Sequence, residues 1–434
     1  MQPFPLLPEQ HSLFFFQHLL GPGVAHNLAT DVQVPAQVGP DRVRSTVEDL
    51  LARRSALRAG LVGRPPRAQW LGAAAQELVV SDVPEVAPAL ERRLTELYHA
   101  ELSGPHESRR ARFELFRDGR GQSLLVLADH LVTDHHSMGV ITRELTGAWS
   151  GRPAPEVVGY PEFCRSRARD GQARAEREKS IWARAFADVP PLRGLMPHGD
   201  GEEQVRAQRD STHPGPALAA AVRELSGLLN VSAFSAVAAL VSLAVWRRTG
   251  QERFAIQTPV STRRDAGAED VVGYLINERP LVCRVDPART LRSYGRQVWQ
   301  SCVRAFRHSH LGVPELAGDV PAFGDSLCQD RVDYLQLHVT RGDGRLPGTV
   351  AGSAGDEVTH RTRELGTFRP GVDLTCTTVR FDFGDDRTLV RTFFGGPRAG
   401  FPAAVALTDD VLWLLGEAAE HVDRPLGDLA GHRG

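Results

Sequence analysis

Several features that would assign a function class are scarce in this sequence of 434 residues. Lysine occurs only at Lys179, and acidic and basic residues nearly balance, which leaves a formal net charge of -2. A chain without excess positive charge lacks the electrostatic surface that polyphosphate backbones require. The composition therefore argues against nucleic-acid binding.

Signals for secretion or membrane insertion are also missing. The longest apolar run, Val231–Trp246, is short for a bilayer span and contains serines, so we expect a buried helix and no membrane association. The N-terminus has no basic stretch before its apolar residues, so no signal peptide is expected. The five cysteines are odd in number and form no C-x-x-C pair, which favours a reducing cytoplasm over a disulfide framework.

The composition is that of a globular chain with a large core. With 41% hydrophobic and 24% charged residues, this length predicts two or three domains, and two comparable halves are the simplest division. An arginine- and glutamate-rich stretch over 165–184 predicts an exposed helix between the halves. The polar tract from Pro197 to Pro216 predicts a surface loop, and the boundary is expected between residues 160 and 215.

Local patterns indicate both helices and strands. Helical spacing of apolar residues predicts a helix over 41–59, capped by Asp41, and another over 407–419. Two apolar runs separated by Asp118-Gly119-Arg120-Gly121 predict a hairpin. Further strands are expected at 254–260, 281–285, 374–383 and 388–394, and a flexible loop is expected at 342–355.

A polar cluster follows the second hairpin strand. The apolar run over 123–128 continues directly into Asp129-His130-Leu131-Val132-Thr133-Asp134-His135-His136-Ser137, after which apolar residues recur at helical spacing. His130 is a candidate proton acceptor, because imidazole titrates near neutrality. The amide groups of the following helix would stabilise an oxyanion, and Ser137 would cap that helix or donate to the same oxygen.

Two other interpretations of this cluster stay open on the residues alone. One is a core histidine with a structural role. The other is a zinc site, because His130 and Asp134 are four residues apart and His135 and His136 lie beside them. That spacing brings ligands together only within a helix, whereas the strand is expected to end at His130.

The cluster resembles the H-H-x-x-x-D-G-x-S motif of nonribosomal peptide synthetase condensation domains, in the chloramphenicol acetyltransferase-like superfamily. Further segments are similar to other motifs of the family, in the family's order across nearly the whole chain. These segments are Pro8-Glu9-Gln10, Arg53-Arg54-Ser55-Ala56-Leu57-Arg58, Thr258-Pro259-Val260-Ser261-Thr262-Arg263 and Gly273-Tyr274-Leu275-Ile276-Asn277.

The resemblance implies an α/β fold with two acetyltransferase-like lobes, each a mixed β-sheet with flanking helices, in a V-shaped pseudo-dimer. We expect the N-terminal lobe over residues 1–175, with the motif, and the C-terminal lobe over 176–434. The resemblance also implies a tunnel between the lobes, which the phosphopantetheine arms of acyl or peptidyl carrier proteins enter from opposite faces. No bound cofactor and no metal are implied.

Roles for single residues follow from the same resemblance. His130 matches the second motif histidine, which positions or deprotonates the acceptor nucleophile. Asp134 matches the aspartate that holds the loop by pairing with an arginine, and Arg263 is the matching arginine. Tyr274 and Asn277 are candidates for lining the tunnel or packing beside it.

Two positions depart from the motif. Asp129 stands where the family has its first histidine, and its burial requires a partner. If Asp129 approaches the ring, its charge raises the pKa of His130. His135 replaces a glycine, which predicts a left-handed backbone angle and a side chain that narrows the tunnel.

We therefore expect a free-standing condensation enzyme of nonribosomal peptide or related natural-product biosynthesis, such as that of an antibiotic. It would transfer an acyl or aminoacyl group from a carrier-protein thioester to an amine or hydroxyl acceptor. The altered Asp129 and His135 motivate an alternative, a catalytically degenerate protein that recruits a carrier or a tailoring enzyme. A coenzyme A-dependent acyltransferase is the third hypothesis.

Overall fold

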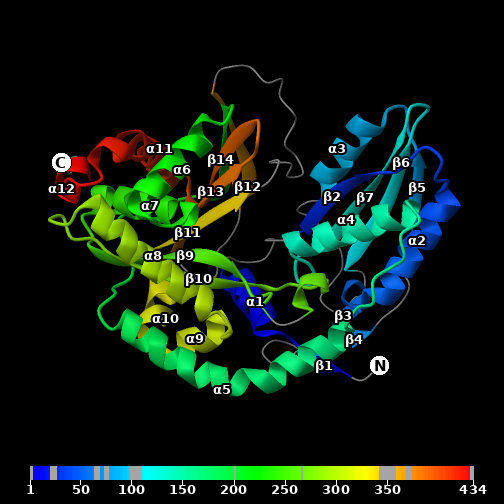
Figure 1. Ribbon diagram of the computed structural model, residues 1–434, viewed down its shortest axis with the longest axis horizontal. Helices are drawn as coiled ribbons and strands as arrows, with labels where there is room; N and C mark the ends of the chain where they lie inside the picture. Colours follow the sequence, from blue (N-terminus) through cyan, green and yellow to red (C-terminus); the bar gives the residue numbers. More distant parts are fainter. Residues whose placement is uncertain are drawn as a thin grey trace.

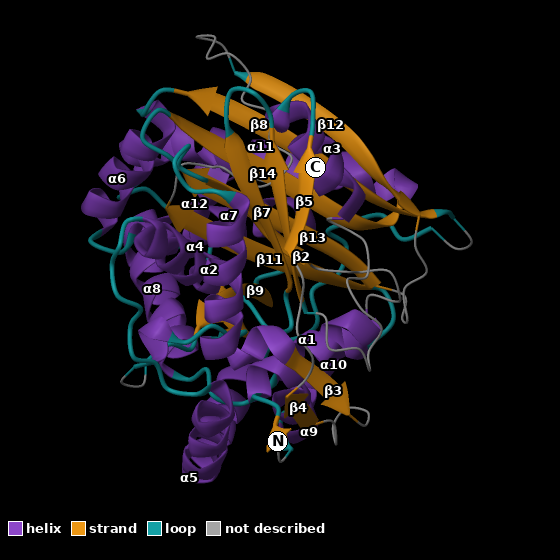
Figure 2. Cartoon of the chain, turned by 90° about the vertical axis from the view of Figure 1, so that its right-hand side faces the viewer, coloured by secondary structure: helices purple, strands orange, loops and turns teal. Residues whose placement is uncertain are grey.

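Two lobes diverge from a long helix, α5 (Tyr160–Phe186), which lies along the base of the molecule (Figure 1). The computed structural model describes residues 3–19, 27–62, 69–72, 78–97, 110–199, 202–264, 267–341, 358–367 and 374–430, so the loop expected at 342–355 lies outside the described residues. A small sheet of β1 (Phe4–Pro5), β4 (Gln69–Gly72) and β3 (Ala59–Val62) also lies at the base, as the turned view in Figure 2 shows.

A four-stranded mixed sheet forms the N-terminal lobe. Its order is β2 (Asn27–Gln33), β7 (Gln122–Asp129), β6 (Ala111–Arg117) and β5 (Leu78–Asp82), and its helices are α2 (Pro40–Arg53), α3 (Val86–Leu97) and α4 (His135–Trp149). Alternate residues of β7 are buried on opposite faces: Leu124 packs with α2 and α4, and Leu125 packs with α3. The expected hairpin is confirmed as antiparallel β6 and β7.

The helix expected over 41–59 is shorter than its apolar pattern suggested. It starts at Pro40, with Gly39 rather than Asp41 at the N-cap, and it ends at Arg53. The turn η1 (Ser55–Arg58) and strand β3 follow at once. Arg54 leaves the helical conformation at the junction, where its buried guanidinium pairs with Glu144 of α4.

A seven-stranded mixed sheet forms the C-terminal lobe, with helices packed on one face. Its order is β10 (Ile276–Arg284), β9 (Arg253–Ser261), β11 (Val332–Arg341), β13 (Leu374–Phe383), β14 (Arg387–Pro397), β8 (Gln204–Pro214) and β12 (Thr359–Thr367). Its larger helices are α6 (Ala217–Leu229), α7 (Ala233–Thr249), α8 (Leu291–Arg307) and α11 (Phe401–Ala418). The shorter helical elements are α1 (Pro8–Leu19), α9 (Val313–Asp319), α10 (Pro321–Cys328), α12 (Leu426–Ala430), η2 (Ala268–Asp270), η3 (Arg398–Gly400) and η4 (Ala419–His421).

The tract expected as a surface loop over 197–216 instead contains β8, an interior strand of this sheet. Its Asp210 pairs with Arg391 of β14 and with Arg363 of β12. Charge pairs between neighbouring strands here replace apolar contacts, so an apolar pattern could not reveal the strand.

The expected apolar helix is confirmed as α7, which is buried within the C-terminal lobe. Among the described residues, one helical stretch, 398–421, has the length and hydropathy of a membrane span. The pair α6 and α7 meets the same criteria only when joined across a bend of 93°.

The two lobes share one helix and exchange one segment. The expected boundary at residues 175 and 176 falls inside α5, which is continuous. Residues 267–275, which we call the crossing segment, leave the C-terminal sheet after β9 and place Val271 and Leu275 in the core of the N-terminal lobe. The crossing segment thus joins the two lobes beside the polar cluster.

Candidate active site

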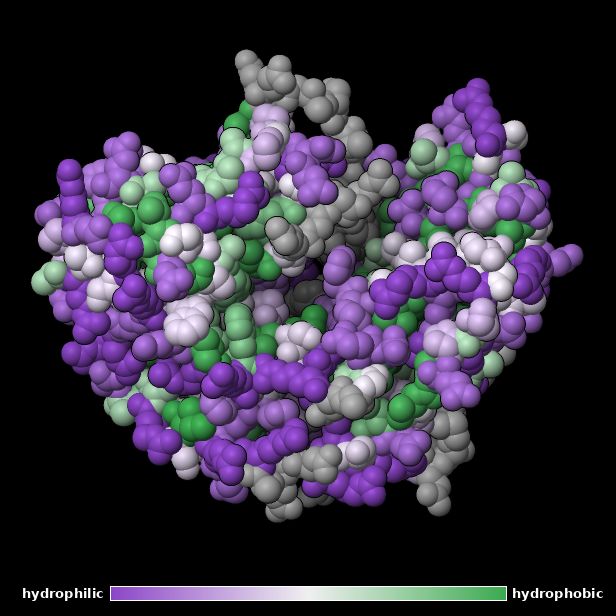
Figure 3. All heavy atoms as spheres, viewed as in Figure 1, coloured by the Kyte–Doolittle hydropathy of each residue, from purple (hydrophilic) through white to green (hydrophobic). Residues whose placement is uncertain are grey.

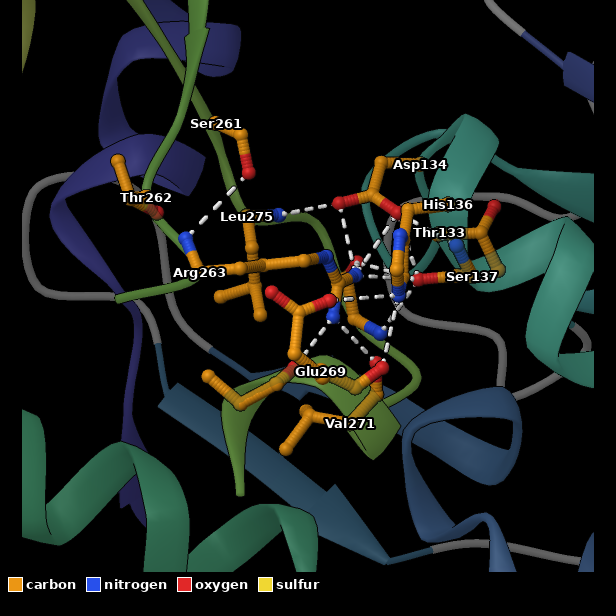
Figure 4. A network of polar contacts seen from close by, with 12 residues as sticks. Thr133, Asp134, His136, Ser137, Ser261, Thr262, Arg263, Glu269, Val271 and Leu275 are labelled. Carbon is orange, nitrogen blue, oxygen red and sulfur yellow. Dashed lines mark hydrogen bonds and ion pairs between the residues drawn. The ribbon is translucent and has the colours of Figure 1, made fainter. Parts of the chain in front are cut away.

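Asp134 and Arg263 form a buried ion pair at the point where α4 meets the crossing segment (Figure 4). Asp134 is the N-cap of α4: its Oδ1 accepts a hydrogen bond of 2.7 Å from Ser137 N. Arg263 Nη2 lies 2.8 Å from each carboxylate oxygen of Asp134, and Leu275 N donates to Oδ2. This carboxylate is thereby satisfied from both lobes.

Arg263 also fixes the backbone of the crossing segment. Its Nη1 donates to the carbonyl oxygens of Ala268 and Val271, each at 2.7 Å. A planar guanidinium with several donors suits this combination of carboxylate and carbonyl acceptors. The structure therefore gives the pair a positioning role in joining the lobes.

Ser137 belongs to the same network. Its Oγ donates to the Gly273 carbonyl oxygen at 2.9 Å and is itself close to Asp134 and Arg263. The residue is fully buried, and the helix cap is Asp134. The expectation that Ser137 caps α4 is wrong, because its position in the first turn makes it the recipient of the cap.

His130 lies directly after β7, with its ring oriented by a hydrogen bond. Its Nδ1 is 2.7 Å from the Thr133 carbonyl oxygen, which can only accept, so Nδ1 carries the proton. In the neutral ring Nε2 then holds the lone pair. The ring meets that of Tyr274 edge-on, with centroids 5.0 Å apart.

Burial lowers the pKa of His130 below its ordinary value of about 6.5. The hydrogen bond to Thr133 and the charges of Asp134 and Asp129 raise the pKa, but their effect is smaller than that of burial. His130 is therefore neutral at pH 7, which is the state a proton acceptor requires.

Asp129 has a partner that the sequence did not reveal. Its Oδ2 pairs with Arg110 at 2.5 Å, and its Oδ1 accepts from Leu131 N at 2.8 Å. The guanidinium offsets the carboxylate charge, so Asp129 raises the pKa of His130 without outweighing burial.

His135 differs from the expectation for a position that the motif fills with glycine. It is the first residue of α4, and its φ is not positive, since the described non-glycine residues with positive φ are Asn230 and Arg331. Its side chain is exposed, whereas Nε2 of the next residue, His136, lies 2.7 Å from the Glu269 carbonyl oxygen of the crossing segment. The predicted left-handed backbone angle is wrong because His135 already lies within α4, where φ is negative.

Tyr274 and Asn277 lie in different surroundings. Tyr274 contacts His130, as described above. Asn277 has no exposed surface, and its side chain bonds Ser12 Oγ and the carbonyl oxygens of Ser309 and Leu311. Asn277 is thus a packing residue rather than part of a cavity wall.

Sequence reasoning missed two polar residues on the C-terminal sheet, Glu278 and His338. Each has a buried side-chain atom without a hydrogen-bond partner, Glu278 Oε2 and His338 Nε2. Their signal in the sequence is a polar residue inside an apolar strand pattern, I-N-E-R-P-L-V and Y-L-Q-L-H-V. Burial lowers the pKa of His338 to about 3, and His130 on the other lobe adds a small lowering effect.

The zinc interpretation finds no support in the geometry. In the part of the chain that the structure describes, no three His, Cys, Asp or Glu side chains are placed to hold a metal ion. Both oxygens of Asp134 are engaged by Arg263.

Comparison with known proteins assigns the family. A model of the condensation domain matches residues 2–331, and the chain belongs to this family. Tyrocidine synthase 3 of Brevibacillus parabrevis is 21% identical over 70% of the chain, and chondramide synthase cmdD of Chondromyces crocatus is 25% identical over 71%. The chain spans only 5% and 8% of the length of these two relatives.

Solved structures confirm the expected acetyltransferase-like fold. The SgcC5 protein of Streptomyces globisporus matches with a TM-score of 0.75 and 23% identity, over 97% of this chain and all of that one. The X-domain from teicoplanin biosynthesis, in its complex with OxyB, matches with a TM-score of 0.72 and 18% identity, over 99% and 96% of the two chains.

Proposed function

We propose that this chain is a condensation enzyme that transfers an acyl or aminoacyl group from a carrier-protein thioester to an amine or hydroxyl acceptor. Its family works in nonribosomal peptide synthesis, where condensation domains form amide bonds between substrates held on the phosphopantetheine of carrier proteins. The observation that carries the proposal is the neutral, oriented ring of His130 beside the joint of the two lobes. The five cysteines of the chain are all free, which fits a reducing cytoplasm.

The chemistry needs one proton acceptor. The acceptor nitrogen or oxygen attacks the thioester carbonyl carbon while His130 Nε2 takes its proton. Collapse of the tetrahedral intermediate breaks the carbon–sulfur bond, and the proton passes to the leaving thiolate. Because the thioester is already activated, alignment and this proton transfer are sufficient.

The test is transfer from a loaded carrier by wild type, His130→Ala and the control His421→Ala, which changes a histidine at the end of η4. Loss of a general base lowers the rate about 10²- to 10⁴-fold, and the control keeps the wild-type rate. Unchanged transfer by His130→Ala, with the fold intact by circular dichroism, removes His130 from the mechanism. Replacing the loaded carrier with free acyl-coenzyme A distinguishes a coenzyme A-dependent acyltransferase, which would turn over without the carrier.

A second candidate function is recruitment of a carrier or tailoring enzyme without bond formation. The departure at Asp129 favours it, as does the likeness to the X-domain, which was solved in a complex with OxyB. Stable binding of a carrier or tailoring enzyme in a pull-down, together with no product in the transfer assay, would establish recruitment in place of catalysis.

A further inference from the structure

Glu278 is a buried carboxylate that the proposed transfer reaction does not use. It lies on β10, four residues after Tyr274, and only 8% of its surface is exposed. Gln336 of β11 lies near enough to lower the pKa of Glu278, and among the described residues the buried Oε2 of Glu278 has no hydrogen-bond partner. The amide of Gln336 is oriented by Thr378, from which its oxygen accepts a hydrogen bond.

Among the described residues, the cation that acts on this carboxylate is Arg279, and its charge lowers the pKa of Glu278 by less than burial raises it. The adjacent Arg279 points to the opposite face of the sheet, where it donates to the carbonyl oxygens of His308 and Leu311. Glu278 forms no ion pair with any described residue. An unpaired buried carboxylate costs folding free energy, and a ligand that completes its hydrogen bonds would offset that cost.

The face that carries Glu278 is turned toward His130. On β11, Gln336 and His338 alternate with the core residues Leu335 and Leu337 and therefore share one face. His130 contributes to the lowered pKa of His338, which places the two rings within electrostatic reach of each other. Among charged groups, Glu278 has the strongest effect on Tyr274, whose ring contacts His130. The space-filling view shows a hollow between the two lobes on the side of the molecule that faces the viewer (Figure 3).

We propose that Glu278 binds a protonated amino group of the substrate other than the attacking nucleophile, opposite His130 in the space between the lobes. This inference rests on the proposed function and narrows it to substrates that carry an amine. An ammonium group would donate a charge-assisted hydrogen bond to Oε2, for which the described residues supply no partner.

The charge state of the cluster agrees with this role. Burial raises the pKa of Glu278 to about 7, and a neighbouring cation would lower it. The other titratable groups around it, on β10, β11, β13 and the crossing segment, are Arg279, Tyr334, His338, Cys376 and Tyr274. Burial raises the pKa values of both tyrosines and of the thiol, and it lowers those of Arg279 to about 10 and His338 to about 3. Glu278 is therefore the group of this cluster that titrates near neutrality.

A binding experiment tests the inference without requiring turnover. The amides of the twenty standard amino acids and the matching α-hydroxy acid amides serve as probes of wild type, Glu278→Gln and the control Glu224→Gln, on the exposed face of α6. At pH 8 we expect wild type and control to bind one or more amines and not their hydroxyl counterparts. Glu278→Gln should bind those amines about 10-fold or more weakly. Equal binding of amines by wild type and Glu278→Gln, or no binding to wild type, overturns the inference.

Steady-state kinetics with loaded carriers then identify which substrate supplies the amine. If it is an acceptor that carries a second amino group besides its nucleophile, Glu278→Gln raises the KM for that acceptor. If it is the donor, N-acetylation of the aminoacyl group removes the difference between wild type and variant. The two proposals can fail independently. Selective amine binding without any transfer would support the amine site and would contradict the condensation activity.

Discussion

The two sides of the space between the lobes hold buried charge in opposite ways. On the N-terminal side, Asp134 is bonded by Arg263, by the first turn of α4 and by the crossing segment. On the C-terminal side, Glu278 has one oxygen for which no described residue is a hydrogen-bond partner. The hydrogen-bonded pair of Asp134 and Arg263 favours one specific arrangement of the lobes. The Glu278 carboxylate, which lacks such bonds among the described residues, lowers stability, and we attribute its presence to the binding of a substrate amine.

The largest expected effect on stability comes from removing Asp134, the hydrogen-bonded carboxylate on the N-terminal side. Asp134→Ala leaves the Arg263 charge buried without its carboxylate and removes the N-cap of α4, so the free energy of unfolding should fall by about 3–5 kcal/mol. Chemical denaturation measures the change. The control is Asp423→Ala, which removes an exposed carboxylate paired with Arg292 and should cost less than about 1 kcal/mol. Equal losses in the two variants would show that the buried pair has no special weight.

Replacing Glu278 should change the free energy of unfolding in the opposite direction to replacing Asp134. The pKa of Glu278 is about 7 in the folded protein and near 4.5 when unfolded, so the folded state binds the proton more tightly. Between these values the unfolded state has lost the proton and the folded state keeps it, so the group's contribution to stability falls as pH rises. Glu278→Gln should therefore stabilise the protein by about 2–3 kcal/mol at pH 8 and by little at pH 4.

Thermal denaturation of wild type and Glu278→Gln across this pH range checks that expectation, with Glu224→Gln as the exposed control. A variant that is less stable than wild type at pH 8 would contradict the idea that Glu278 is held at a cost to folding.

The contrast between the two sides also shows what sequence reasoning could reach. The Asp134 and Arg263 pair could be anticipated because each residue lies in a motif at a recognisable end of a strand or helix. Strand β8 could not, because Asp210 is paired by strands that are distant in sequence and Arg209 by Asp409 of α11. The ion pair between Arg110 and Asp129 could not be anticipated either. Arg110 lies directly before β6, and it reaches Asp129 only because β6 and β7 are paired. Glu278 had a local signal, but its missing partner is a property of the assembled sheet.

The pH dependence of transfer sharpens the account of the N-terminal side. Since burial lowers the pKa of His130, the acid limb of kcat should lie below the ordinary imidazole value of about 6.5. Asp129→Asn removes a charge that raises this pKa, so the limb should move further toward acid, by less than about one pH unit. Measurement of kcat against pH for both proteins checks the sign. A limb that moves toward alkaline pH would mean that Asp129 acts on the ring in another way.

The smallest effect is expected at the most conspicuous departure from the motif. His135 begins α4 with an exposed side chain, so His135→Gly should retain or increase acyl transfer and should cost no more than about 1 kcal/mol of stability. His136→Gly is the matched control for flexibility at the same helix end, because it removes the contact with Glu269 of the crossing segment. Initial rates and thermal denaturation of both variants make the comparison. If His135→Gly stops transfer while it remains folded, and His136→Gly does not, the His135 imidazole takes part in the chemistry. The N-terminal side of the site would then include a second functional histidine.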